Sequence, residues 1–570
     1  MSLRIIASGR LLLESGMSFN PAAAPFGRLI LYLKQLGVLG WGALIVATLL
    51  IIPLVAVVSS VFVQGSVWEQ LAETVLASYL VNTLWLLLGV ACGVISMGVL
   101  SAWLIASYRF PGHAILQWAL LLPLAMPAYV MAYAYTDALQ FAGPVQTALR
   151  EWTGWRAREY WFPEIRSIYG AAAMFSFALY PYVYLLARVA FLEQSRSALE
   201  AGRLAGYSAF GSFWRVALPL ARPAIVAGSA LALMETLADF GTVAYFALPT
   251  FTTGIFRAWF SYGDPVAAAQ LASCLLAFVL IVLFLERRNR GAARYQLTGV
   301  RRPAHSHSLD GGKAMLATLA CTAPVVLGFI LPVGLLIDLA LEERMHWSSR
   351  VLTLAVNSFS LAGVTAVAAI LLALLLTYAG RMTRSPLVNL ANRGVSLGYA
   401  APGAVIAVGV LIPLGKLDNA LAQWLHTHWG INIGLLLTGS IVALVYAYLV
   451  RYLSVALQTV DAGLTKITAS MDDAARSLGL NVSAVLKRVH APMLYGSLLS
   501  AGLLVFVDVM KELPATFAMR PFNFDTLAVE AYNLAKDERL SEAAVPALLI
   551  VLVGLLPLLF ISRRLLNLSK

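Results

Sequence analysis

Charged residues are scarce in this chain. Only 12% of its 570 residues are Asp, Glu, Lys or Arg, whereas 60% are hydrophobic and the mean hydropathy is +0.81. Soluble globular proteins carry about 25% charged residues. The scarcity excludes a soluble protein, so most of the chain must lie in lipid or pack against helices that do.

Cysteine is also rare, and several catalytic motifs are missing. Cys92, Cys274 and Cys321 all lie in apolar runs, without the spacing of a metal site or a disulfide framework. The sequence has no G-x-x-x-x-G-K-[ST] loop, so the chain itself is not expected to bind ATP. H-E-x-x-H and G-x-S-x-G are absent as well. We therefore expect no enzyme, no catalytic residue and no cofactor bound by this chain.

Long apolar runs make up most of the sequence. A helix that crosses a bilayer needs about 20 predominantly apolar residues. The fold class that follows is an all-α polytopic membrane protein. Twelve spans are predicted, at residues 38–63, 79–107, 113–141, 168–190, 222–247, 265–285, 314–341, 353–379, 387–414, 432–455, 494–518 and 543–562.

A basic linker divides these spans into two halves that resemble each other. Val81-Asn82-Thr83 matches Val356-Asn357-Ser358, and Met126-Pro127 matches Ala401-Pro402, both 275 residues apart. Six spans in each half make the repeat parallel, with a pseudo-twofold axis along the membrane normal. The expected organisation is a cytoplasmic N-terminal segment, a first six-helix half, a basic cytoplasmic linker and a second six-helix half, at residues 1–37, 38–285, 286–313 and 314–570.

Lys and Arg are concentrated in alternate loops. The positive-inside rule places such loops in the cytoplasm. It predicts that both termini are cytoplasmic and that the protein is a multi-pass component of the inner (plasma) membrane, in contact with lipid. The basic linker, which includes Arg287, Arg288 and Arg290, fits a lipid-facing segment better than one that binds nucleic acid.

Two polar segments, the first polar loop (191–221) and the second polar loop (456–493), match each other 273 residues apart. In each, a serine followed by an acid suits a helix start, and a glycine two turns later suits a left-handed helix end. Ser208 and Asn481 then suit the start of a second helix. An interfacial amphipathic connector is the simpler alternative. The matched residues are Ser197, Glu200, Ala201, Gly206 and Pro219 in the first loop, and Ser470, Asp473, Ala474, Gly479 and Pro492 in the second.

Both loops resemble the EAA motif of ABC-importer permeases, in which Glu-Ala-Ala is followed by glycine and a closing proline. The first copy departs from the pattern at Gly202, and the second copy begins with Asp473. The resemblance implies a type I ABC-importer permease with two copies of a separate ATPase subunit, which would hold ATP and Mg, docked on these loops. It also implies an extracytoplasmic substrate-binding protein.

The segments that follow each loop look like the fused permeases of iron(III) importers. These segments are Glu235-Thr-Leu-Ala-Asp239-Phe-Gly241-Thr and Lys511-Glu512-Leu-Pro514-Ala-Thr516-Phe. The similarity implies a permease for ferric iron. Related fused permeases carry thiamine, so thiamine or another small solute remains open as the cargo. An ion-coupled secondary transporter is the alternative from a different class.

Five ionisable residues lie within the predicted spans that follow the polar loops. An ionisable group in lipid costs several kcal/mol, so these residues should face the bundle interior or water. Oxygen ligands suit a hard cation in transit, and no resident metal site is assigned. Hydrogen bonds between helices, with Lys511 neutralising a carboxylate, are the structural alternative. The tyrosines of the third and fourth spans are interpreted as packing residues. The candidate pathway residues are Glu235, Asp239, Asp508, Lys511 and Glu512.

Overall fold

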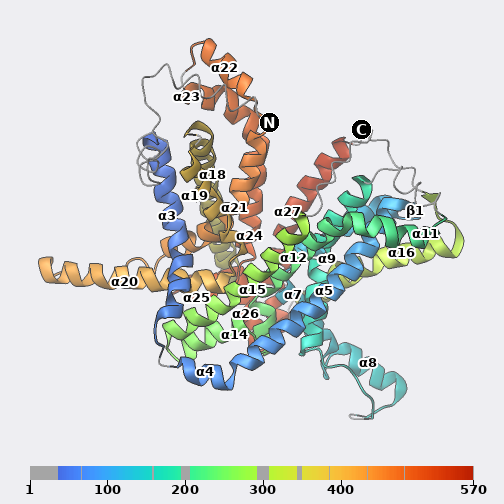
Figure 1. The fold of residues 1–570 in the computed structure, drawn as a ribbon. Coiled ribbons are helices and arrows are strands. Elements are labelled where there is room, and N and C mark those ends of the chain that lie inside the picture. The colour runs from blue at the N-terminus through green and yellow to red at the C-terminus, as the bar shows by residue number, and fades with distance from the viewer. Residues whose placement is uncertain are drawn as a thin grey trace.

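A computed structural model describes residues 36–65, 67–156, 159–193, 206–291, 307–342, 349–383, 385–432, 434–480 and 482–568. The protein is all-α, as predicted (Figure 1). Within the described residues, the only strands are β1 (Tyr108–Arg109) and β2 (His307–Ser308), which pair in parallel. Eleven helices there are long and apolar enough to cross a membrane, or twelve if a bent pair counts as one span.

The first half is built from long helices joined by short helical pieces. Its elements are α3 (Gly37–Ser59), η1 (Ser60–Phe62), α4 (Trp68–Thr74), α5 (Leu76–Ser107), α6 (His113–Ala119), η2 (Leu122–Ala125), α7 (Ala128–Leu139), α8 (Pro144–Thr153), α9 (Ile168–Glu193), α11 (Ala209–Ser212), η3 (Phe213–Ala217), α12 (Leu218–Ala238), α13 (Gly241–Tyr245), α14 (Phe251–Phe256), η4 (Arg257–Ser261) and α15 (Pro265–Gly291).

The second half follows the same order. Its elements are α16 (Gly311–Val325), η5 (Val326–Ile330), α17 (Leu331–Glu342), α18 (Ser349–Thr383), α19 (Pro386–Ser396), η6 (Gly398–Ala400), α20 (Gly403–Trp429), α21 (Ile441–Leu464), α22 (Ala469–Ser477), α23 (Val482–Val485), η7 (Leu486–His490), α24 (Ala491–Met510), α25 (Pro514–Met519), α26 (Leu527–Lys536) and α27 (Leu540–Leu568).

The repeated asparagines occupy equivalent positions in the two halves. Asn82 on α5 donates to the carbonyl of Pro249, and Asn357 on α18 donates to the carbonyl of Asp525, over 3.0 and 3.1 Å. Each acceptor lies just before a short helix, α14 or α26, on the side away from the polar loops. The sequence repeat is therefore also a repeat of tertiary contacts.

Two predicted spans, the third and the ninth, are broken at the repeated prolines. Proline pushes the residue before it out of the helical region, and Met126 and Ala401 have extended ψ angles of 110° and 125°. The third span bends by 93° between its two parts. The prediction of a ninth span at 387–414 was wrong, because the long apolar helix there is α20, which begins only after Pro402.

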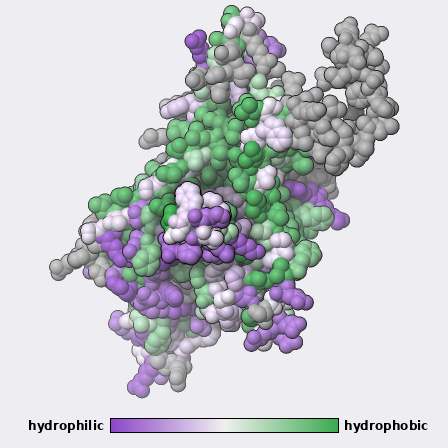
Figure 2. Space-filling view, turned by 90° about the vertical axis from the view of Figure 1, so that its left-hand side faces the viewer, coloured by the Kyte–Doolittle hydropathy of each residue, from purple (hydrophilic) through white to green (hydrophobic). Residues whose placement is uncertain are grey.

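The first helices of the two halves cross over and interlock them. Although α3 begins the first half, it packs on α18, α19 and α20 of the second. In turn, α16 packs on α5 and α6, and α17 packs on α7 of the first half and on α27. The cores of the two halves are held together by this exchange. On the side where α20 projects, Figure 2 shows a broad hydrophobic area with hydrophilic residues gathered below it.

Each polar loop runs into a long helix without a break. The π-helical turns Phe213–Ala217 and Leu486–His490 lie directly before Pro219 and Pro492, at the second position of α12 and α24. Proline removes an N–H donor and crowds the preceding turn, and the wider π turn accommodates it. The second short helix of each loop is thus continuous with the spanning helix that follows.

Candidate functional site

A cavity of about 110 Å³ lies between the two halves. A buried water needs at least about 10–15 Å³, so the cavity has room for several. All five residues predicted for the pathway line it, together with side chains from α7, α9, η6 and α21. The five are Glu235, Asp239, Asp508, Lys511 and Glu512.

Two of the carboxylates cap short helices that start at the cavity wall. Asp239 accepts a hydrogen bond from the N–H of Thr242 over 2.8 Å, at the start of α13. Glu512 accepts from the N–H groups of Ala515 and Thr516 over 2.8 and 2.9 Å, at the start of α25. Free N–H groups at a helix start favour a negative charge. These two carboxylates therefore hold the breaks after α12 and α24 in place.

Among the described residues, the other two carboxylates have side-chain partners only. Glu235 accepts from the Tyr399 hydroxyl over 3.0 Å, which joins α12 of the first half to η6 of the second. Asp508 Oδ1 lies 3.1 Å from Lys511 Nζ, within the second half. The structural alternative, with Lys511 next to a carboxylate, is thus present at Asp508. Whether these residues conduct a substrate stays a prediction.

Sequence reasoning missed Arg451, which is almost fully buried in α21 and lines the same cavity. Its Nη1 lies 3.6 Å from Glu512 Oε1, and its guanidinium lies 5.1 Å from the centre of the Tyr452 ring. Its Nε has no hydrogen-bond partner among the described residues. A lone arginine in an apolar run is itself a sign of a functional or paired position, and that signal was available in the sequence.

The cavity is acidic overall, with four carboxylates against Lys511 and Arg451. Tyr129, Tyr182, Tyr399 and Tyr452 add phenol groups to its lining. The tyrosines of the third and fourth spans thus fall into two groups. Tyr129 and Tyr182 line the cavity, whereas Tyr133, Tyr180 and Tyr184 are buried in packing away from it. Within the described part of the chain, no group of three His, Cys, Asp or Glu side chains is arranged to hold a metal ion. The cavity offers hard oxygen ligands without a preformed metal site.

The polar loops show several of the predicted backbone features. Gly206 and Gly479 have φ angles of +82° and +80°, the left-handed conformation expected at a helix end. The Ser208 hydroxyl accepts from the N–H of Gly211 over 3.1 Å and so caps α11 as predicted. Ser197, Glu200, Ala201 and Asn481 lie outside the described residues.

The prediction that Ser470 starts the first helix of the second loop was wrong. This helix, α22, begins at Ala469, so Ser470 lies inside its first turn and its hydroxyl is 2.8 Å from that of Thr468. Asp473 and Ala474 lie within α22, and the N–H of Leu478 donates to the carbonyl of Ala474. The left-handed Gly479 still follows the end of α22, although this helix starts earlier than predicted.

The two loops are anchored to their own halves by different side chains. In the first, Trp103 on α5 packs against Phe191 and Phe213, with ring centres 5.2 and 5.0 Å apart. In the second, Asp472 on α22 accepts from Arg381 over 2.7 Å and is hydrogen-bonded to His490 over 2.6 Å.

Ionisation of Asp472 is favoured by this network. Burial opposes the charge, but the hydrogen bonds from Arg381 and His490 outweigh it and hold the pKa of Asp472 below its usual value. The other ring nitrogen of His490 is hydrogen-bonded to the Tyr378 hydroxyl over 2.7 Å. The second loop therefore depends on charge where the first depends on aromatic packing.

The fold and the cavity define a membrane permease made of two related, interlocked halves. The family model described as "Binding-protein-dependent transport system inner membrane component" matches residues 94–290. The chain is 30% identical over 258 residues to the sulfate transport system permease protein CysT of Escherichia coli. The aligned region covers 43% of this chain and 88% of that protein.

Two further relatives differ in how much of the chain they cover. The Fe(3+)-transport system permease protein FbpB 2 of Haemophilus influenzae is 27% identical over 502 residues, or 87% of this chain and 91% of that protein. The molybdenum transport system permease protein ModB of Escherichia coli is 31% identical over 198 residues, or 33% of this chain and 82% of that protein. The chain belongs to this family of inner membrane components and is a multi-pass permease subunit of an ABC importer.

Proposed function

We propose that this chain forms the membrane pathway of a ferric iron importer. The observation that carries the proposal is the acidic cavity between the halves, which is lined by four carboxylates and two cationic side chains. Oxygen ligands suit a hard cation. The relative whose name specifies Fe(3+) also aligns with 87% of the chain, whereas those named for sulfate and molybdenum align with less than half of it.

The charge of the cavity argues against an oxyanion as cargo. Sulfate and molybdate are anions. The carboxylates of the cavity would repel them, and this repulsion is strong because a low-dielectric site screens charge less than water does. The same excess attracts a cation and raises its local concentration. A cavity of about 110 Å³ also suits a partly hydrated ion better than an organic solute as large as thiamine.

The continuous helices suggest how an ATPase would act on the cavity. The two polar loops and both chain termini would lie on the cytoplasmic side. Two ATPase subunits would bind there, one to each polar loop. Because α11, η3 and α12 form one continuous helical path, as do α23, η7 and α24, movement of a loop would move the spanning helix. Glu235 and Asp508 lie near the far ends of α12 and α24. Loop closure would therefore reshape the cavity wall.

The experiment is uptake of radiolabelled ferric iron into vesicles that contain this chain, its ATPase and its substrate-binding protein. Glu235→Gln combined with Asp508→Asn should lower the initial rate at least about tenfold, if each lost charge costs about 1 kcal/mol of cation stabilisation. Glu73→Gln, at an exposed site on α4, is the matched control and should transport normally. ATP-driven uptake of sulfate, molybdate or thiamine in place of iron would contradict the proposal. So would uptake driven by an ion gradient without the ATPase.

A further inference from the structure

A second cavity lies on the side of the protein away from the polar loops. It has a volume of about 610 Å³ and is formed by α13, α14 and η4 of the first half and by α25 and α26 of the second. In Figure 1, α14 and α26 lie toward the lower end of the molecule, whereas α22 and α23 of the second polar loop lie at the top. A solute that comes from the side opposite the polar loops would meet this cavity, here called the vestibule, before the acidic cavity.

An aromatic layer separates the two cavities. The ring of Phe240 lies 4.0 Å from that of Phe256, 5.6 Å from that of Phe517 and 5.5 Å from that of Tyr532, all measured between centres. Phe240 directly follows Asp239 of the acidic cavity, and Phe517 follows Thr516, which donates to Glu512. The floor of the vestibule is therefore one residue away from the wall of the acidic cavity, and side chains of both halves close it.

The charge of the vestibule is opposite to that of the acidic cavity. Arg257, Arg520 and Lys536 line it, and no carboxylate of a described residue does. Arg257 and Lys536 are exposed, come from different halves and form no ion pair with a described residue, although Arg257 interacts with the Tyr79 phenol. A solute would thus meet a basic cavity first and an acidic one next.

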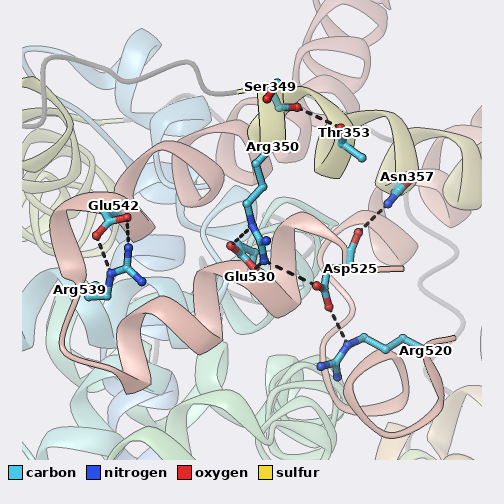
Figure 3. Close-up of polar contacts among 9 residues, drawn as sticks. All are labelled: Ser349, Arg350, Thr353, Asn357, Arg520, Asp525, Glu530, Arg539 and Glu542. Atoms are coloured by element: carbon cyan, nitrogen blue, oxygen red, sulfur yellow. Dashed lines mark hydrogen bonds and ion pairs between the residues drawn. The ribbon is translucent and has the colours of Figure 1, made fainter. Parts of the chain in front are cut away.

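The wall that carries Arg520 is fixed by a chain of ion pairs. Figure 3 shows Arg520 bonded to Asp525 and Arg350 bonded to Glu530, with the nitrogen–oxygen distances 2.8 and 2.7 Å. The Arg520 guanidinium also lies 5.3 Å from the centre of the Phe517 ring. Arg520 is thus partly neutralised and holds the wall, which leaves Arg257 and Lys536 as the cations available to a ligand.

We propose that the vestibule binds a small multivalent oxyanion, of the carboxylate or phosphate class, that arrives as a ligand of the ferric ion. The inference rests on the proposed function and deepens it, because it states the form in which iron enters. Cationic side chains from two halves form charge-assisted hydrogen bonds with such an anion. The volume lies within the range of about 300–1,000 Å³ typical of small-molecule sites.

The opposed charges then separate the ion from its ligand. The oxyanion stays with Arg257 and Lys536 while it gives up the ion, because the acidic cavity repels it. It then dissociates to the side opposite the polar loops. The ferric ion exchanges its oxygen ligands from the anion to water and the carboxylates of the acidic cavity. Only iron–oxygen coordination bonds change in this step, and no electron is transferred, so the iron remains ferric.

The test is equilibrium binding of radiolabelled citrate, and separately of inorganic phosphate, to the purified full chain without iron or partner proteins. We expect saturable binding of at least one of them at one site per chain. Arg257→Gln and Lys536→Gln should each weaken it about fivefold, the effect of roughly 1 kcal/mol. Lys416→Gln, at an exposed position on α20, is the matched control and should bind normally. Lys536→Gln alone suffices if Arg257→Gln does not fold.

The outcomes distinguish this inference from the proposed function. Iron uptake by a chain that binds neither anion, or that binds equally in all variants, would overturn the inference and leave the proposed function standing. Loss of affinity for the substrate-binding protein in the Arg257→Gln/Lys536→Gln double variant, without anion binding by the wild type, would assign the vestibule to an acidic surface of that protein instead. Uptake of sulfate rather than iron would overturn both.

Discussion

The described parts of the two polar loops share backbone features and differ in the side chains that hold them. Gly206 and Gly479 have the same left-handed conformation, and a π turn followed by proline leads each loop into its spanning helix. Yet Trp103 packs on aromatic rings in the first half, whereas Tyr378, at the position 275 residues later, is hydrogen-bonded to His490 in the second.

This difference distinguishes the backbone features that both loops require from the anchoring side chains that can differ between them. The left-handed glycine and the π turn set the path of the chain from the loop into the membrane, so both copies need them. The anchor only has to fix the loop to its half, and aromatic packing or an ionic network can do so. The two loops should therefore respond alike to changes in the backbone and differently to changes in charge or packing.

The largest effect is expected where the two halves meet at the acidic cavity. Glu235→Lys and Asp508→Lys should each abolish iron uptake, since a lysine there reverses the attraction for a cation. Asp508→Lys should also lower the thermal stability more than Glu235→Lys does, because the new lysine would face Lys511. Initial uptake rates and melting curves measure both. Binding of the ATPase should be unchanged, and normal uptake by either variant would refute the pathway role.

The aromatic anchor of the first loop provides the next test. Trp103→Ala should destabilise this loop by about 2 kcal/mol, since Trp103 is half-buried and a fully buried tryptophan is worth about 3–5 kcal/mol. Hydrogen exchange should rise at Tyr207 and in the turn Phe213–Ala217 and stay constant in α22. Equal loss of protection in both loops would show that the anchors are not independent.

The ionic anchor of the second loop should be sensitive to acid. The depressed pKa of Asp472 means that its ion pair stabilises the fold above about pH 4, the usual Asp pKa, and that this contribution is lost as the pH falls through the lower folded value. Cleavage by pepsin should therefore increase in the second loop on acidification. Asp472→Asn, which cannot ionise, should remove the pH step, and a similar step in the first loop would contradict the comparison.

The smallest effect is expected at a single helix cap. Ser208→Ala should cost about 1 kcal/mol by removing the acceptor for the Gly211 N–H. Ser96→Ala is a suitable control, since the Ser96 hydroxyl donates to the carbonyl of Gly93 within α5 and caps no helix end. Hydrogen exchange at Gly211 and Ser212 measures the difference. No change there would mean that Ser208 does not stabilise α11.

Most of the fold could be predicted, because apolar runs and repeated motifs are properties of short sequence segments. The apolar runs predict the spans, and Asn82 and Asn357 mark the repeat. The breaks at Pro127 and Pro402 were harder, since the flanking residues are apolar on both sides and the run alone does not show a bend. The start of α22 at Ala469 was missed because Thr468 and Ser470 are both plausible caps.

The cavity could be predicted only in part. The four carboxylates and Lys511 stand out as charges in apolar runs. A spacing of four residues predicts that Glu235 and Asp239 share one helix face, as do Asp508 and Glu512. The helices end before Asp239 and Glu512, which the spacing alone does not show. Tyr399 and Arg451 come from other helices, and only the packing of η6 and α21 brings them to the same cavity. The vestibule was missed altogether, because Arg257 and Lys536 lie in polar connecting segments where basic residues are common.

The most direct test of the account is ATP-dependent uptake of ferric iron by the reconstituted complex, with wild type compared to Gly206→Asp/Gly479→Asp. A non-glycine residue at such a φ angle is strained by about 1–2 kcal/mol, and aspartate adds a charge at the loop surface. We expect iron uptake that needs both ATP and the ATPase and is lost in the double variant. Iron uptake that persists in the double variant, or that proceeds without the ATPase, would contradict it.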